Sequence, residues 1–217
     1  EWLCAQAPAD AGRASWLCVE LRRDRIFQTL SRALLLGVHN LCLVAGDAKE
    51  LLQRLEPGSL SQVFVNFPQP PVRRSGDEGA GGEAPHLLTP DVMRLIRTAL
   101  VPHGTLLVLS DNLPYLRWLA TELDGVDGLE SVSTSGHLAR SKCAAKTAIW
   151  RGRPGLEFGV ADTGATSFFD RLWQNGKIRQ RYFLCVEKHD FRETVDPKAV
   201  DSSGALPRAK RRKTASV

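Results

Sequence analysis

The chain has 217 residues, of which 43% are hydrophobic and 24% are charged, and its formal net charge is +5. This composition excludes an intrinsically disordered chain, and the absence of any apolar run of about 18 residues argues against a membrane-spanning helix. The length is typical of one domain with appendages, and the basic excess favours a polyanionic partner. No secretory signal opens the chain, so we expect a nuclear or cytoplasmic protein with no membrane contact.

Five cysteines are present, an odd number without a CxxC pair. Four of them, Cys4, Cys18, Cys42 and Cys185, lie in apolar runs. This pattern predicts buried, reduced thiols rather than disulfides or a metal centre, and the sequence indicates no metal ligands.

The first predicted elements alternate between helix and strand. Residues 1–8 are typical of the end of a helix, and residues 15–21 form an apolar run that suits a strand buried on both faces of a parallel sheet. A helix is expected over residues 23–36, with Gly37 as its left-handed cap. The next strand covers residues 41–45, after which Asp47 is expected to cap a short helix.

Residues 63–67 are the third predicted strand, and prolines 68, 70 and 71 end it, because proline cannot donate to a sheet ladder. Residues 75–85 are rich in Gly and Glu and are expected to form a mobile loop. Thr89 should cap a helix that begins at Pro90. Another strand follows over residues 105–109, and Asp111 or Asn112 should begin the helix after it.

The last part of the chain has weaker signals. Residues 124–165 show no clear periodicity, and residues 182–187 predict a final antiparallel strand. We expect residues 1–189 to form the folded domain and residues 190–217 a disordered basic tail. The basic cluster over residues 210–213 indicates a nuclear import signal or an RNA-contacting arm, or a solvated tail without a role.

Strands that alternate with helices at this spacing predict an α/β fold with a doubly wound, mostly parallel sheet. Polar residues follow four of the predicted strands: Glu20, Asp47, Asn66 with Gln69, and Asp111. The carboxyl ends of parallel strands meet at one edge, so these residues are expected to converge on one crevice. They favour a nucleoside-bearing cofactor, whereas each carboxylate alone could be a helix cap.

Several segments, taken in order, resemble the signature of tRNA (guanine-N7)-methyltransferases. They are Val19–Arg22, residues 40–48, Phe67–Pro70, His86–Pro90, and Ser110–Asp111 with Tyr115. The resemblance covers about residues 1–123 and, more weakly, residues 166–187. It implies the S-adenosylmethionine-dependent, seven-stranded class I methyltransferase fold with three αβα layers. The family's first strand and Gly-rich loop would precede Glu1, so an N-terminally truncated fragment is expected.

The resemblance also implies roles for individual residues. In the family pattern, the positions expected to bind S-adenosylmethionine are Glu20 and Arg22 at the ribose, Asp47 and Ala48 at the adenine, and Asn66 with Phe67 under the methionine portion. The positions expected to bind the tRNA substrate are Arg73, Asp111, Thr166 and Asp170, with Ser167 as an alternative to Thr166.

Gln69 stands where the family has an active-site Asp, so Asp111 and Gln69 are the candidate catalytic residues. The expected reaction is methyl transfer to N7 of a guanosine in tRNA, with a possible requirement for a WD-repeat partner protein. The substitution at position 69 leaves an alternative, a catalytically lapsed relative that binds RNA or a partner. A third reading, an amino methyltransferase, is weakest because the prolines after Asn66 are misplaced for that motif.

Overall fold

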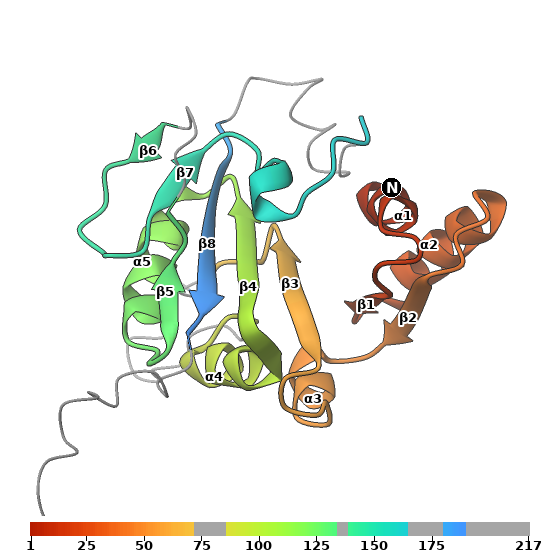
Figure 1. The fold of residues 1–217 in the computed structure, drawn as a ribbon, viewed down its shortest axis with the longest axis horizontal. Helices are drawn as coiled ribbons and strands as arrows, with labels where there is room; N and C mark the ends of the chain where they lie inside the picture. The colour runs from red at the N-terminus through yellow and green to blue at the C-terminus, as the bar shows by residue number, and fades with distance from the viewer. Residues whose placement is uncertain (72–85, 134–138, 165–179, 190–217) are drawn as a thin grey trace, which may run out of the picture.

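The structure is a computed structural model that describes residues 1–71, 86–133, 139–164 and 180–189. Two strand ladders form the frame of the molecule (Figure 1). The smaller sheet pairs β1 (Trp16–Glu20) with β2 (Leu41–Ala45) in parallel. The larger sheet contains β3 (Leu60–Asn66), β4 (Leu100–Ser110), β8 (Tyr182–Lys188), β7 (Ile149–Arg151) and β6 (Arg140–Ser141), in that order, and β5 (Leu129–Ser131) also pairs with β8.

The larger sheet is mixed, and four of its six strands point in the same direction. Strands β3 and β4 are parallel, whereas β8 runs antiparallel to β4. Strands β5 and β7 each run antiparallel to β8, so both point in the direction of β4, while β6 is reversed. The predicted fold class and the antiparallel direction of the final strand are therefore confirmed.

The core lies on both faces of β4 and β8, because alternate residues of a strand point to opposite faces. Leu106 and Val108 of β4 and Leu184 of β8 belong to the cluster that packs against α4 (Pro90–Ala99) and α5 (Leu113–Asp124). Their neighbours Leu107 and Phe183 belong to a second cluster on the opposite face. The short 3-10 helix η1 (Leu156–Phe158) covers that face through Phe158.

Helix ends follow the predicted capping pattern. The Thr89 hydroxyl accepts a hydrogen bond from the N–H of Val92, and Pro90 opens α4. Of the two candidates for the start of α5, Asn112 is the cap. Helix α2 (Arg23–Leu35) ends before Gly37, whose φ is +63°, a conformation that glycine adopts without steric cost.

Helices α1 (Trp2–Ala9) and α3 (Ala48–Leu52) were also expected, and both are present. The carboxylate of Asp47 accepts a hydrogen bond from the N–H of Lys49 and so caps α3.

None of the helices in the described ranges combines the length and the apolar character needed to cross a bilayer.

The prediction that the first strand is buried on both faces was wrong. Leu17 in β1 is 37% exposed, and Leu21 just after it is 70% exposed. Strand β1 pairs with β2 alone among the described strands, and the apolar residues Phe27 and Leu34 of α2 are themselves exposed. A continuous apolar run is therefore not sufficient to place a strand in the middle of a sheet.

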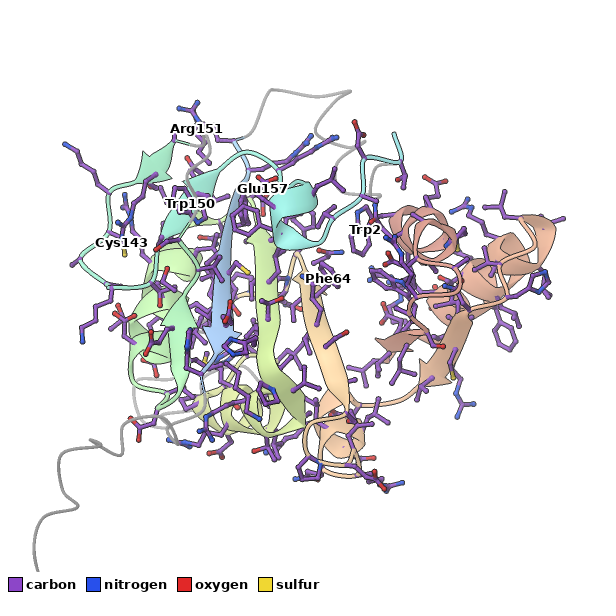
Figure 2. All side chains as sticks on the ribbon, in the orientation of Figure 1. Trp2, Phe64, Cys143, Trp150, Arg151 and Glu157 are labelled. Atoms are coloured by element: carbon purple, nitrogen blue, oxygen red, sulfur yellow. The ribbon has the colours of Figure 1, made fainter. Side chains whose placement is uncertain are left out.

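A cluster of three aromatic rings lies between the two sheets. Trp16 of β1 stacks on Phe64 of β3, with ring centroids 5.3 Å apart, and Trp2 of α1 meets Phe64 edge to face at 5.4 Å. Figure 2 shows Trp2 and Phe64 pointing toward each other across this space. Aromatic packing thus joins β1 and β3, which share no backbone ladder in the described structure.

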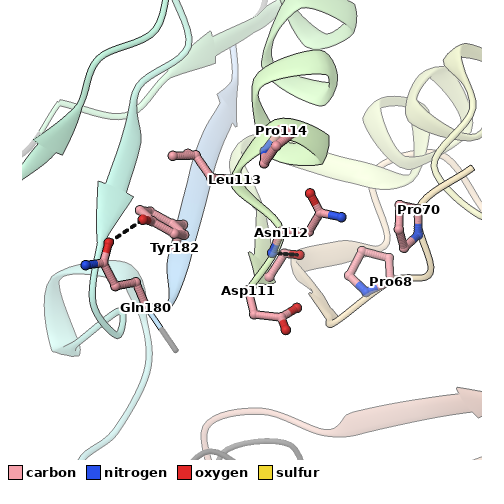
Figure 3. Close-up of a pocket in the computed structure, with 9 residues that line it drawn as sticks. Pro68, Pro70, Asp111, Asn112, Leu113, Pro114, Gln180 and Tyr182 are labelled. Atoms are coloured by element: carbon pink, nitrogen blue, oxygen red, sulfur yellow. Dashed lines mark hydrogen bonds between the residues drawn. The ribbon is translucent and has the colours of Figure 1, made fainter. Parts of the chain in front are cut away.

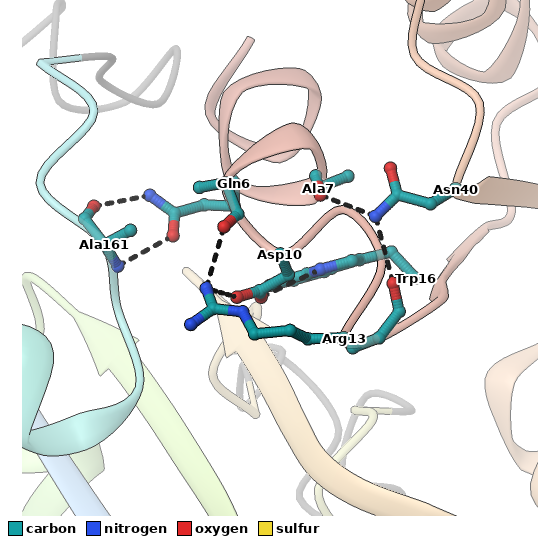
Figure 4. Close-up of polar contacts among 9 residues, drawn as sticks. Gln6, Ala7, Asp10, Arg13, Trp16, Asn40 and Ala161 are labelled. Atoms are coloured by element: carbon teal, nitrogen blue, oxygen red, sulfur yellow. Dashed lines mark hydrogen bonds and ion pairs between the residues drawn. The ribbon is translucent and has the colours of Figure 1, made fainter.

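The side-chain amide of Gln6 fastens α1 to the segment after η1 (Figure 4). Gln6 is 2% exposed; its Nε2 donates to the carbonyl oxygen of Ala161 at 2.8 Å, and its Oε1 accepts from the N–H of Ala161 at 3.0 Å. The contact joins residues 155 positions apart in the chain. It therefore holds the N-terminal helix against the larger sheet.

Replacing Gln6 with Leu should lower the free energy of unfolding by about 1–3 kcal/mol, because the peptide groups of Ala161 lose both partners at a buried site. Urea unfolding followed by circular dichroism measures the change. The matched control is Gln28→Leu at an exposed position of α2, for which a change within about 0.5 kcal/mol is expected. Equal effects of the two substitutions would show that the Gln6 contact adds no stability.

All five cysteines are free, as predicted, but they are not uniformly buried. Cys4 and Cys185 are buried, whereas Cys42 is exposed, because the face of β2 that carries it is uncovered. The prediction of burial was therefore wrong for Cys42, and Cys18 is only half-buried. Burial raises the pKa of Cys185 to about 12, with a further contribution from Glu187.

Thiol labelling tests the difference in exposure between Cys42 and Cys185. At pH 8 a thiol with a pKa of about 12 is ionised in on the order of one molecule in ten thousand, and only the thiolate reacts. Iodoacetamide should therefore modify Cys42 in the native protein and leave Cys185 unmodified until a denaturant is added. Peptide mass spectrometry gives the rates at each site. Native-state labelling of Cys185 as fast as that of Cys42 would contradict the described burial.

Candidate functional site

A cavity of about 510 Å³ lies where β3 and β4 end (Figure 3). Its wall is formed by two turns and by the start of β8. The lining residues are Pro68, Pro70, Ser110, Asp111, Asn112, Leu113, Pro114, Gln180 and Tyr182. Because this is the carboxyl edge of the parallel strands, it is the edge at which open α/β sheets bind ligands.

The turn after β4 presents Asp111 to this cavity. Ser110 is buried, and its hydroxyl accepts a hydrogen bond from the N–H of Asn112 at 3.1 Å. Asn112 in turn accepts from the N–H of Tyr115 at 3.0 Å and begins α5. These two bonds fix the residues on either side of Asp111, whose carboxylate points into the space between Pro68 and Gln180 in Figure 3.

The turn after β3 forms the opposite wall. Phe67 has a φ of +51°, a left-handed conformation that costs a non-glycine residue about 1–2 kcal/mol. Its N–H donates to the carbonyl oxygen of Leu109 at 2.7 Å, and its ring packs against the cluster around Phe183. This anchoring turns the chain so that Pro68 and Pro70 line the cavity, while Gln69 is exposed and is not among the lining residues.

Sequence reasoning missed the wall contributed by β8. Tyr182 pairs with Ser110 across the β4–β8 ladder, and its hydroxyl donates to the side-chain oxygen of Gln180 at 2.5 Å. The signal was present in part: an antiparallel strand over residues 182–187 must begin at the carboxyl edge of its parallel neighbours. That direction places Tyr182 beside Asp111.

A second cavity, of about 280 Å³, lies over the face of β3 and β4 that carries the Phe183 cluster. Asn66 lines this cavity, together with Phe64, and not the first one. Helix α1 contributes Trp2 and Gln6, and the rest of the wall comes from residues 107, 109, 153–156 and 160–164.

The predicted ribose ligand Glu20 ends β1 and is held by its own loop. Its carboxylate accepts from the N–H of Arg22 at 3.0 Å and from Nη1 of Arg25 at 3.4 Å. The guanidinium of Arg22 pairs with Asp24 and lowers the pKa of that carboxyl group. Arg22 therefore faces Asp24 in this structure.

Asp47 and Ala48 lie at the same edge of the smaller sheet as Glu20, which stands opposite Ala45 in the β1–β2 ladder. The structure thus places the predicted site residues in two groups. Glu20 lies near Asp47, and Asp111 lies near the turn after β3. Neither of the two cavities is lined by a residue of β1 or β2 among the described residues. The three predicted positions Arg73, Thr166 and Asp170 lie outside the described residues, as do the loop over 75–85 and the tail over 190–217.

The sheet order and the site at its carboxyl edge define an α/β fold of the class I methyltransferase type. The fold is similar to that of NSun6 from Pyrococcus horikoshii, solved with SFG, with a TM-score of 0.51. The two sequences are 11% identical, and the match covers 85% of this chain and 44% of that chain.

A family model described as "Putative methyltransferase" matches residues 1–149, and the chain belongs to this methyltransferase family. The chain is also similar to two proteins named tRNA (guanine-N(7)-)-methyltransferase. The one from Corynebacterium jeikeium is 30% identical over 128 residues, which are 58% of this chain and 47% of that protein. The one from Chlamydia pneumoniae is 27% identical over 180 residues, which are 80% of this chain and 66% of that protein. The chain thus spans less than two thirds of either relative.

Proposed function

We propose that this chain belongs to an enzyme that transfers a methyl group from S-adenosylmethionine to N7 of a guanosine in tRNA. The observation that carries the proposal is the position of Asp111, which a fixed turn presents to a cavity at the carboxyl edge of the sheet. The cavity volume, about 510 Å³, lies in the range of small-molecule sites and is sufficient for a nucleobase. Family membership and the names of the two relatives support the same activity.

Methyl transfer to guanine N7 needs no general base. Guanine N7 carries a lone pair and no proton, so the enzyme must chiefly hold the base in line with the methyl group. S-adenosylmethionine supplies that methyl group from a sulfonium, whose bond to carbon breaks as the bond to N7 forms. Positive charge then develops on the purine, and the carboxylate of Asp111 stabilises it or accepts hydrogen bonds from the base's N1 and N2 donors.

The residues proposed to hold the cofactor suit its chemistry. Glu20 offers carboxylate oxygens to ribose hydroxyls and retains acceptor capacity beyond its bonds to Arg22 and Arg25, because two oxygens provide about four lone-pair sites. Asp47 and Ala48, beside Glu20, are proposed to flank the adenine. Asn66 and Phe67, which follow from β3 into the strained turn, are proposed to lie under the methionine portion.

Substrate RNA is proposed to bind through Arg73, Asp111, Thr166 and Asp170. Contacts between basic side chains and phosphates would make the affinity fall as salt rises, and a splayed-out guanosine would enter the cavity. The proposal includes a WD-repeat partner and nuclear import through the basic cluster at residues 210–213. Both are supported only by the sequence pattern and the family resemblance.

Calorimetry with S-adenosylmethionine tests the cofactor part of the proposal. The titration compares this chain with a form extended upstream of Glu1, each with and without the WD-repeat protein. Saturable binding by the extended form supports the proposal. Failure of both forms to bind, even with the partner present, would contradict it.

A second candidate is a relative that binds RNA or a partner without transferring methyl groups. Gln69, in the position of a family Asp, is the observation that favours it. The substitution Gln69→Asp separates the two readings. A gain in methyl transfer would indicate a weakened enzyme, whereas no transfer by either protein, despite RNA binding, would favour the lapsed relative.

A further inference from the structure

Two histidines and two glutamates gather at the edge of the larger sheet opposite the candidate active site. Nδ1 of His103 is 2.7 Å from Oε1 of Glu187, and Nε2 of His189 is 3.7 Å from the same oxygen. Nε2 of His189 is also 3.9 Å from Oε2 of Glu130. One ligand atom each from His103, Glu187 and His189 lies within 4.8 Å of the other two.

This cluster is separate from the proposed methyltransferase site. Strand β8 runs from Tyr182, which lines the first cavity, to Glu187 near its other end (Figure 1). Five residues of an extended strand span about 17 Å. A ligand at the cluster would therefore not touch the cavity that holds Asp111.

The sheet register places the two carboxylates side by side. Glu130 of β5 stands directly opposite Glu187 of β8 in an antiparallel pair. Like charges in this position repel each other and destabilise the pair. The neighbouring Lys188 makes no ion pair with either carboxylate among the described residues; its Nζ donates to the carbonyl oxygen of Leu100 at 2.6 Å. A cation held between the two strands would relieve the repulsion.

The backbone fixes both histidines against these carboxylates. His103 has a φ of +63°, a conformation in which a non-glycine residue is strained. The next residue, Gly104, is packed so closely that a Cβ there would lie 2.9 Å from the carbonyl oxygen of Val101. The N–H of His189 donates to the carbonyl oxygen of Gly128 at 3.0 Å. The fold therefore sets the backbone positions of both histidines, while their side chains remain 76% and 44% exposed and reachable by an ion from solvent.

We propose that His103, Glu187 and His189, with Glu130 beside them, bind one divalent transition-metal ion of the Zn²⁺ class. Two imidazoles and a carboxylate form a donor set that Zn²⁺ prefers. Ligand atoms about 2.0–2.2 Å from a tetrahedral ion are roughly 3.3–3.6 Å apart. The 3.7 Å separation already lies close to this range, the 2.7 Å pair must open by roughly 0.6–0.9 Å, and a separation of up to 4.8 Å must close by roughly 1.2–1.5 Å. The ion joins β4, β5 and β8 and stabilises the sheet, a role that the cysteine pattern gave no reason to expect.

Calorimetry with ZnCl₂ alone, on the whole chain freed of metal by a chelator, tests the proposal. We expect one ion per chain and a higher melting temperature in its presence. The double substitution His103→Gln with His189→Gln should abolish both effects, and Glu187→Gln should weaken binding at least tenfold. The matched control is His39→Gln, an exposed histidine before β2, which should bind zinc like the unchanged protein.

Two results would overturn the proposal. Absence of zinc binding would show that the cluster is only a set of ion pairs. Binding unchanged by the double substitution would place the ion elsewhere, for example on the exposed thiol of Cys42. Circular dichroism confirms that each variant is folded, and if the double variant is not, Glu187→Gln alone decides, because it preserves the size of the side chain.

Discussion

Replacing Asp111 with Asn is expected to slow methyl transfer to tRNA by about 10²–10³-fold, the usual cost of removing one group that stabilises charge in a transition state. Asn matches Asp in shape, and the bonds made by Ser110 and Asn112 hold the turn in both proteins. The loss should therefore come from the missing charge rather than from misfolding. Initial rates of methyl incorporation from labelled S-adenosylmethionine measure it.

The control for this substitution is Asp91→Asn in α4, whose side chain is 73% exposed and pairs with Arg94 on the surface. Its rate should equal that of the unchanged protein. Cofactor affinity should be the same in all three proteins, since Asp111 is assigned to the substrate. A rate for Asp111→Asn within twofold of the unchanged protein would remove this residue from the proposed mechanism.

Replacing Phe183 with Ala should lower the free energy of unfolding by about 3–5 kcal/mol, a large part of the stability of an ordinary domain. Phe183 is fully buried in β8, and its ring meets that of Phe158 edge to face at 4.9 Å. The substitution leaves a cavity between the larger sheet and η1. Equilibrium unfolding in urea gives the difference from the unchanged protein.

Leu35→Ala is the control, because Leu35 is 87% exposed at the end of α2, and a change within about 0.5 kcal/mol is expected. A loss below 1 kcal/mol for Phe183→Ala would mean that the face covered by η1 contributes little to the core. The placement of η1 against the sheet would then be wrong.

The elements that the sequence predicts well are those whose signals are local. A capping residue, a first-turn proline and a following glycine depend on the few residues around them, and so Thr89, Asn112 and Gly37 mark helix ends as expected. The strands over residues 41–45 and 182–187 were found for the same reason, since a short apolar run and an alternating pattern are both visible within one segment.

Features that depend on distant partners were not predictable. The exposure of Leu17 and Cys42 depends on what covers the smaller sheet. The hydrogen bonds between the side chain of Gln6 and the backbone of Ala161 join residues 155 positions apart. Strands β5, β6 and β7 have two or three residues each, too few to show a period. The pairing of His103 with Glu187 likewise spans 84 positions and has no local signal.

The candidate site was predicted in part. Asp111 and the turn after β3 do meet at the carboxyl edge of the larger sheet, as strand direction requires. Glu20 and Asp47 are likewise neighbours, because β1 and β2 pair in parallel. The distance from Glu20 and Asp47 to Asp111 depends on how the smaller sheet lies against the larger one. Trp2, Trp16 and Phe64 determine that packing through contacts that no short segment encodes.

Mass spectrometry of nucleosides from methylated tRNA tests the central claim most directly. Unmodified tRNA is incubated with S-adenosylmethionine and the protein, with and without the proposed WD-repeat partner, and then digested to nucleosides. The account predicts 7-methylguanosine, in an amount that falls sharply with Asp111→Asn. Methylation of an exocyclic amine instead, or no methylated nucleoside under any of these conditions, would contradict it.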